Sequence, residues 1–178
     1  MTRWVALLRG VNVGGVRVGM ADLRRLVTGL GHKDVRTYLR SGNVVFGSAV
    51  RDPGALARGI ERALADELDV TVPVLVRSAH EMTTIAGGNP YADREADPTR
   101  LLVAFLATAP EASAVAGLAA PAGETVAFTV TGREVFLHYQ DGGYGRSKFT
   151  NAHLEKRLGV VATTRNWRSV RALAELAA

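Results

Sequence analysis

Two polar loops in the first quarter of the chain carry the residues best suited to holding an anion. The first is glycine-rich and reads Arg9-Gly10-Val11-Asn12-Val13-Gly14-Gly15, and the second is the turn Ser41-Gly42-Asn43. Together with Arg17 they offer unshielded backbone N–H groups, amides, a hydroxyl and guanidinium groups, a set that suits an oxyanion. Ordinary glycine turns with left-handed asparagines would present the same residues without any ligand.

A second glycine-rich loop reads Gly142-Gly143-Tyr144-Gly145-Arg146-Ser147-Lys148 and lies between an expected strand and an expected helix. In a phosphate-binding P-loop the lysine follows the last glycine directly, whereas here an arginine and a serine intervene. A Walker-type NTPase is therefore disfavoured. Two interpretations stay open: a looser anion cradle with Lys148 as a point charge, or a glycine turn in which Ser147 caps the helix.

A third polar segment, Thr163-Thr164-Arg165-Asn166-Trp167-Arg168, precedes Arg171. Trp167 falls on the apolar face of the expected last helix, so it is predicted to anchor the core. The three arginines recur every three residues and suggest a basic helix face. Such a face tracks nucleic-acid phosphates in some proteins and is merely solvated in others.

The sequence offers little catalytic machinery. It contains no cysteine, and its four histidines form no H-x-H or H-E-x-x-H pattern, so we predict no metal site and no cofactor. Neither Ser41 nor Ser147 lies in a G-x-S-x-G elbow. Catalytic residues therefore remain unknown at this stage.

The elements that must position these loops follow from the hydrophobic pattern. The run 4–8 predicts a buried strand, 20–30 an amphipathic helix, 35–40 and 44–46 a pair of strands, 53–68 a helix and 70–77 a strand. This β-α-β-β-α-β order is the ferredoxin-like arrangement. It places the loop after the first strand and the turn between the second and third strands at the same edge of the sheet.

The second half shows a similar order. Strands are predicted at 101–107, 126–130 and 135–139 and helices at 111–119, 147–158 and 166–177, with a capping box at Ser78-x-x-Glu81 that begins a connecting helix. We therefore predict an α+β protein of two ferredoxin-like β-α-β-β-α halves with antiparallel sheets, joined by a connecting helix and followed by a C-terminal helix. The expected divisions are residues 1–77, 78–100 and 101–178.

Charge is unevenly distributed along the chain. Residues 1–40 carry a net charge of +6, residues 41–132 of −5 and residues 133–178 of +4. A basic excess at both ends favours an anionic partner, either a small molecule or, more weakly, a nucleic acid. The apolar run near the N-terminus is too short for a signal peptide and no run is long enough for a membrane span, so we expect a cytoplasmic protein without a membrane partner. The oligomeric state is not indicated.

Three stretches together resemble the bacterial family called domain of unknown function 1697. They are Ala6–Gly15, Val35–Tyr38 with Ser41–Phe46, and Ser147–Asn151 with Ala162–Trp167. The resemblance implies ferredoxin-like halves but no activity. Its motif residues coincide with the polar turns, and the resulting ligand-site prediction comprises Arg9, Asn12, Gly14, Gly15, Ser41, Asn43, Lys148, Asn151, Thr164, Arg165 and Asn166.

Three functions are compatible with these observations. The first is a binding protein for an anionic small molecule, phosphorylated or nucleotide-like, held at the glycine-rich turns. The second is a nucleic-acid-binding protein that uses its basic ends. The third is a phosphoryl hydrolase resembling acylphosphatases, in which Arg9 or Arg17 would hold the phosphoryl group and Asn43 would position water. Whether the protein is an enzyme is left open.

Overall fold

The computed structural model describes residues 1–141 and 143–178, which form two compact units. The first unit comprises Met1–Gly87 together with Ala172–Ala178, and the second comprises Gly88–Arg171. The connecting helix thus belongs to the first unit, and the end of the C-terminal helix does as well. The linker expected before residue 101 belongs to the second unit.

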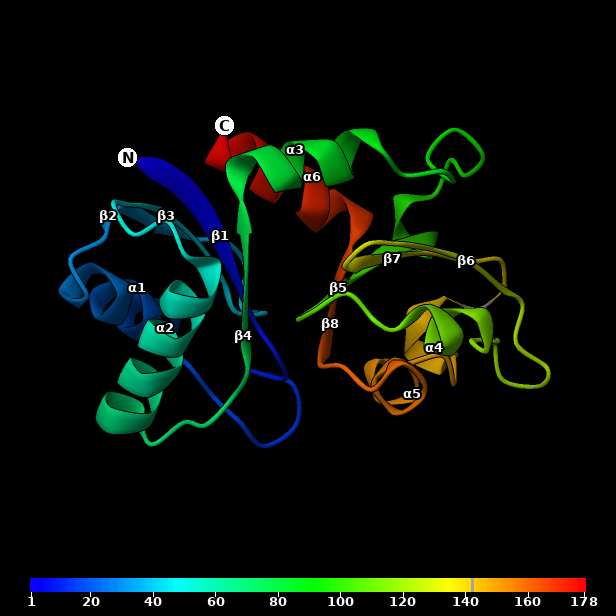
Figure 1. Ribbon diagram of the computed structural model, residues 1–178, viewed down its shortest axis with the longest axis horizontal. Helices are drawn as coiled ribbons and strands as arrows, with labels where there is room; N and C mark the ends of the chain where they lie inside the picture. Colours follow the sequence, from blue (N-terminus) through cyan, green and yellow to red (C-terminus); the bar gives the residue numbers. More distant parts are fainter. Residues whose placement is uncertain (142) are drawn as a thin grey trace. The chain divides into compact units, whose positions relative to one another are not determined.

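The first unit is built on a four-stranded antiparallel sheet with the strand order β2-β3-β1-β4. Helices α1 and α2 cover one face of this sheet (Figure 1). The order and the antiparallel pairing are those of a ferredoxin-like fold, as the sequence predicts. The elements are β1 (Thr2–Leu8), α1 (Met20–Gly29), β2 (Lys33–Thr37), β3 (Asn43–Ser48), α2 (Pro53–Leu68), β4 (Val74–Ser78) and α3 (Ala79–Gly87).

Local sequence signals set the helix boundaries of the first unit. Asp52 caps α2 by accepting a hydrogen bond from Gly54 N–H, and Pro53 opens the helix. At α3 the predicted capping box is confirmed, because Ser78 N–H donates to the Glu81 carboxylate at 2.7 Å and Glu81 N–H donates back to the Ser78 hydroxyl at 3.2 Å.

Two strands of the first unit are shorter than predicted. β2 ends at Thr37 rather than Arg40, since Leu39 has a left-handed backbone with φ +55° that cannot continue a strand. The connection to β3 is therefore the five-residue segment 38–42. β4 begins at Val74 rather than Val70, directly after Pro73, which has no N–H to donate to a sheet.

The second unit repeats the same architecture. Its antiparallel sheet has the order β6-β7-β5-β8, which is the ferredoxin-like order again. The elements are the short 3₁₀ helix η1 (Pro98–Arg100), β5 (Leu101–Leu106), α4 (Ala112–Ala116), β6 (Val126–Thr131), β7 (Glu134–Tyr139), η2 (Tyr144–Arg146), α5 (Asn151–Leu158), β8 (Ala162–Asn166) and α6 (Trp167–Ala177), the last of which ends in the first unit (Figure 1).

Strand β8 was missed by the sequence analysis. Its sequence, Ala-Thr-Thr-Arg-Asn, lacks the apolar alternation of a half-buried strand, yet it pairs antiparallel with β5. It completes the β-α-β-β-α-β order and places Arg165 in the sheet rather than on a helix. The predicted basic face of three arginines is therefore wrong, because of the three only Arg168 and Arg171 are exposed on α6.

The two units are an internal duplication that extends one helix beyond the ferredoxin-like fold. In each, the fourth strand ends in a buried arginine followed by a polar residue that caps the next helix: Arg77 and Ser78 before α3, and Arg165 and Asn166 before α6. Both caps accept a hydrogen bond from the backbone N–H three residues later, at 3.2 Å for Ser78 and 2.9 Å for Asn166. The repeated unit is thus β-α-β-β-α-β-α.

Each unit has its own apolar core between its sheet and its helices. In the first, Ala6, Leu8 and Phe46 from the strands pack with Leu23 of α1 and Ile60 of α2. In the second, strand residues such as Ala104 and Leu137 pack with Phe149, which precedes α5, and Leu154 within it. None of the helices in the described ranges has both the length and the apolar character that a membrane span requires.

Candidate functional site

The loop after β1 and the connection between β2 and β3 lie side by side, as the topology predicts. Leu8 N–H donates to Gly42 O at 2.8 Å, and the Asn12 amide donates to Arg40 O at 2.6 Å. Segments thirty residues apart in sequence are thereby joined at one edge of the first sheet.

Asn12 holds this corner together with its own side chain. It has a left-handed backbone with φ +56°, its Nδ2 donates to Val18 O and Arg40 O, and its Oδ1 accepts from Val18 N–H at 3.0 Å. Both amide protons are therefore used within the protein. Asn12 shapes the site, and its side chain is not available to donate to an anion.

Asn43 is also engaged internally. It is fully buried as the first residue of β3, and its Nδ2 donates to Tyr38 O and to the Ser41 hydroxyl, each at 2.8 Å. A catalytic water has no access to a side chain in this position. The acylphosphatase-like role considered for Asn43 is not supported by this geometry.

A cleft of about 520 Å³ opens between the two loops and the start of α1. Its lining residues are Asn12, Gly14, Arg17, Val18, Gly19, Met20 and Arg40. Two predicted residues, Asn12 and Gly14, thus lie at the cleft, while Arg40 was not among the predicted ligands. Its position is set by Asn12, which binds its carbonyl oxygen, and no local motif in the sequence indicates that contact.

The cleft is cationic. Arg17 and Arg40 are exposed, and neither guanidinium has a hydrogen-bond or ion-pair partner in residues 1–141 and 143–178. The start of α1 adds little positive charge to the cleft, because the Asp22 carboxylate lies against Gly19. Its Oδ2 is 3.1 Å from the position that a Cβ on Gly19 would take. That carboxylate would repel an anion placed on the helix end itself, so the positive charge at the cleft comes mainly from the two arginines.

The remaining predicted residues of the first unit lie beside the cleft rather than in its lining. Arg9 is half-buried, and its backbone N–H donates to Pro73 O at 3.0 Å. Gly15 is exposed in the glycine loop, and Ser41 accepts the hydrogen bond from Asn43. The other predicted residues belong to the second unit and are considered there.

The second glycine-rich loop holds a carboxylate of the protein itself. Glu124 accepts hydrogen bonds from the Ser147 hydroxyl at 2.6 Å and from Lys148 N–H at 2.9 Å. The described part of this loop is therefore an internal anion cradle; Gly142 lies outside the described residues. The helix predicted from residue 147 begins only at Asn151 and is capped by Thr150, so Ser147 does not cap it.

This contact predicts a pH-dependent stability. The Ser147 hydroxyl and then the Lys148 N–H lower the pKa of Glu124 below its usual value. A lowered carboxyl pKa stabilises the fold above the unfolded-state pKa, and that contribution is lost as the pH falls through the folded-state pKa. We expect Glu124→Gln to lower the urea midpoint at pH 7, and the difference from the parent protein to shrink at acidic pH. An equal difference at pH 7 and pH 3 would contradict this assignment.

The third polar segment has structural contacts. The Thr164 hydroxyl donates to Asn151 Oδ1 at 2.5 Å, and Asn166 caps α6. Arg165 is buried, donates to the Thr163 hydroxyl and to Thr164 O, and has its pKa lowered to about 10 by desolvation. The structure thus brings Asn151 and Thr164 together, and their side chains hydrogen-bond to each other.

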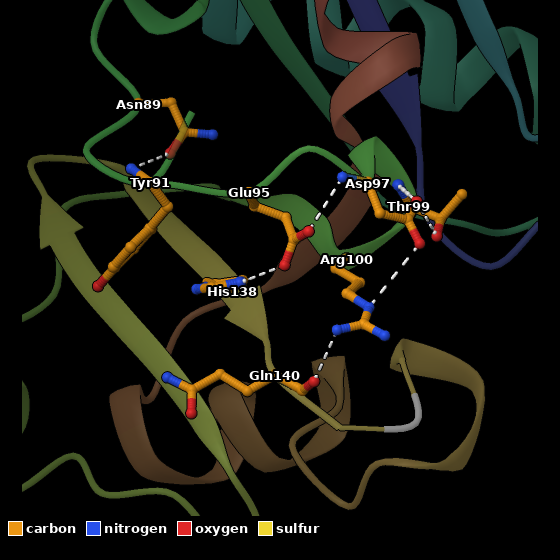
Figure 2. Close-up of polar contacts among 8 residues, drawn as sticks. All are labelled: Asn89, Tyr91, Glu95, Asp97, Thr99, Arg100, His138 and Gln140. Atoms are coloured by element: carbon orange, nitrogen blue, oxygen red, sulfur yellow. Dashed lines mark hydrogen bonds and ion pairs between the residues drawn. The ribbon is translucent and has the colours of Figure 1, made fainter. Parts of the chain in front are cut away.

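A polar cluster that the sequence analysis missed lies on the linker and on β7 of the second unit (Figure 2). The Glu95 carboxylate contacts His138 Nε2 at 2.8 Å and accepts from Asp97 N–H at 2.9 Å. The Asp97 and His138 contacts, in that order, lower the pKa of Glu95. The pair is separated by 43 positions, so no local motif reveals it.

This cluster ties the linker to the hairpin of the second unit. Tyr91 OH lies 2.8 Å from the Thr129 hydroxyl. Arg100 donates to Gln140 O at 3.0 Å (Figure 2). In the described ranges no group of three His, Asp or Glu side chains could hold a metal ion. The cleft of the first unit, by contrast, presents two exposed arginines.

Comparison with known proteins identifies a family. Among solved structures, the conserved bacterial protein SP0830 from Streptococcus pneumoniae is similar over 99% of both chains, with a TM-score of 0.70 and 24% sequence identity, which supports the fold alone. No curated protein resembles the chain closely enough to count as a relative. The model of the family described as protein of unknown function (DUF1697) matches residues 1–136. The chain therefore belongs to the DUF1697 family.

Proposed function

We propose that the protein binds an anionic small molecule, phosphorylated or nucleotide-like, in the cleft of its first unit. The observation that carries this proposal is the pair of arginines, Arg17 and Arg40, that face the cleft without ion-pair partners among the described residues. Exposed arginines alone are common on protein surfaces. Here they converge on a cleft beside glycine backbone, which is an arrangement that suits phosphate.

The second unit has much shorter loops at the two positions that form the cleft in the first unit. Between β5 and α4 it needs only the five residues 107–111, and between β6 and β7 only Gly132 and Arg133. The first unit uses the eleven residues 9–19 and the five residues 38–42 at the same two places. The fold itself does not require the longer loops. Their extra residues form the cleft, and loops that a scaffold does not need are where binding functions concentrate.

Ligand-induced stabilisation tests the proposal directly. At 1 mM phosphate or nucleotide and a Kd of about 100 μM, linkage predicts about 1.4 kcal/mol of added stability, or a rise in Tm of roughly 3–5 °C for a chain of this size. We expect Arg17→Gln with Arg40→Gln to abolish this rise. Arg51→Gln with Arg62→Gln removes the same charge from exposed positions of the same unit outside the cleft, and should leave it intact.

The same two double variants separate this proposal from nucleic-acid binding. The basic ends of the chain favour that alternative. However, a nucleic-acid base would need an exposed aromatic side chain to stack on, and Phe46 of β3 is buried in the first core. Binding through general charge would weaken equally in both double variants and fall steeply with salt. Equal losses in both variants would refute a specific cleft site.

A further inference from the structure

Exposed apolar side chains lie on both loops that form the cleft, and we call Val13, Val16 and Leu39 the rim residues. Six large hydrophobic side chains of the described residues are exposed, and three of them lie on the two cleft loops: Val13 at 73%, Leu39 at 57% and Val16 at 37%. Each adjoins a lining residue in sequence, since Val13 precedes Gly14, Val16 precedes Arg17 and Leu39 precedes Arg40. Val18 and Met20 add apolar surface to the lining itself.

Leu39 is the most informative of these residues. Its φ of +55° lies in the left-handed region, which leucine rarely adopts and asparagine or glycine adopts readily. Asn12, on the facing loop, is left-handed too, but it is an asparagine whose side chain makes three hydrogen bonds. Leu39 is not a residue type that favours this backbone and has no polar side chain to form such bonds, and more than half of its surface is in water. A strained and exposed leucine is better explained by a ligand than by the fold.

We infer that the ligand of the proposed anion site is a soluble phosphate monoester with an apolar substituent. This inference rests on the proposed function, because the arginines must first hold the phosphate group. With the phosphate held by Arg17 and Arg40, the substituent reaches the exposed rim residues Val13 and Leu39 on the two loops. Its apolar surface then leaves water together with theirs, which strengthens binding.

A matched series of ligands tests the inference. Phenyl phosphate and glycerol phosphate are both monoesters of similar size, and they differ in the polarity of the substituent. By isothermal titration calorimetry we expect phenyl phosphate to bind roughly tenfold more tightly than glycerol phosphate or inorganic phosphate, as burial of an aromatic ring predicts. If inorganic phosphate binds and phenyl phosphate gains nothing, the inference fails while the proposed function stands. If none of the three binds, the inference fails, and the proposed function fails with it if nucleotides give no stabilisation either.

Substitution at the rim gives the second test. Leu39→Asn should reduce phenyl phosphate affinity about threefold to tenfold, leave the inorganic phosphate affinity unchanged, and raise Tm because asparagine accepts the left-handed backbone. Val13→Thr should act in the same direction on affinity. Val50→Thr, at an exposed valine outside both loops, is the control and should change neither affinity. An equal loss for phenyl phosphate and inorganic phosphate in Leu39→Asn would overturn the assignment.

A lipid phosphate would present similar chemistry, and vesicles distinguish it from a soluble ligand. We expect no more sedimentation with phosphatidic acid vesicles than with phosphatidylcholine vesicles at 0.15 M salt, where surface attraction is screened within about 8 Å. Sedimentation with phosphatidic acid that Leu39→Asn abolishes would assign the rim to a membrane surface and overturn the soluble ligand.

Discussion

Replacing Gly42 with alanine is expected to lower the free energy of unfolding by about 2–5 kcal/mol. Gly42 has φ +80°, and a Cβ there would stand 2.5 Å from Val11 Cγ2 and 2.8 Å from Leu8 Cβ. Both neighbours are buried and cannot move away cheaply. The left-handed backbone costs about 1–2 kcal/mol and overpacking a further 1–3 kcal/mol or so. Urea denaturation followed by circular dichroism measures the sum.

Gly132→Ala is the matched control for this substitution. Gly132 also lies in a turn between two strands and has φ +59°, but a Cβ there would meet nothing within 4 Å. Only the backbone cost of about 1–2 kcal/mol is expected. Equal destabilisation by the two alanines would mean that the contact of Gly42 with Leu8 and Val11 is not tightly packed.

Most of the fold was predictable because its elements carry local signals. The apolar run at 4–8, the Asp52-Pro53 start of α2 and the capping box at Ser78 each specify structure within a few residues, and all three are confirmed. Strand β8 carries no such signal. Its threonines and buried arginine form a strand because β5 lies beside it, and a pairing between segments about sixty residues apart leaves no trace in local periodicity.

The candidate site was predictable in place but not in detail. Topology alone brought the loop after β1 next to the turn before β3, and the structure joins them through Asn12 and Gly42. Which polar groups stay available depends on three-dimensional contacts. Asn43 is used by Tyr38 and Ser41, and the Ser147 loop is filled by Glu124. Arg40 lines the cleft on a loop whose backbone is bound by Asn12, and no sequence motif predicts this contact.

Asn12→Ala is expected to lower the free energy of unfolding by about 4–5 kcal/mol and to disable the cleft. Three hydrogen bonds that join the glycine loop to Val18 and Arg40 are lost, each worth about 1 kcal/mol net, and alanine must also adopt φ +56°. Because the bond to Arg40 O fixes the second loop, its loss frees Arg40 from its position at the cleft. The affinity for phosphate should then fall at least tenfold, by roughly the 1.4 kcal/mol that such a factor represents.

Two control variants separate the parts of this effect. Asp69→Ala places alanine at another left-handed position, φ +54° at the end of α2, and should cost only the backbone term of about 1–2 kcal/mol with phosphate affinity unchanged. Asn12→Gly avoids the cost of the left-handed backbone but does not restore the lost hydrogen bonds. It should therefore recover part of the stability lost in Asn12→Ala and none of the affinity. Phosphate binding that survives in Asn12→Gly would show that Arg40 holds its position without Asn12. The joint between the two loops would then not be what organises the site.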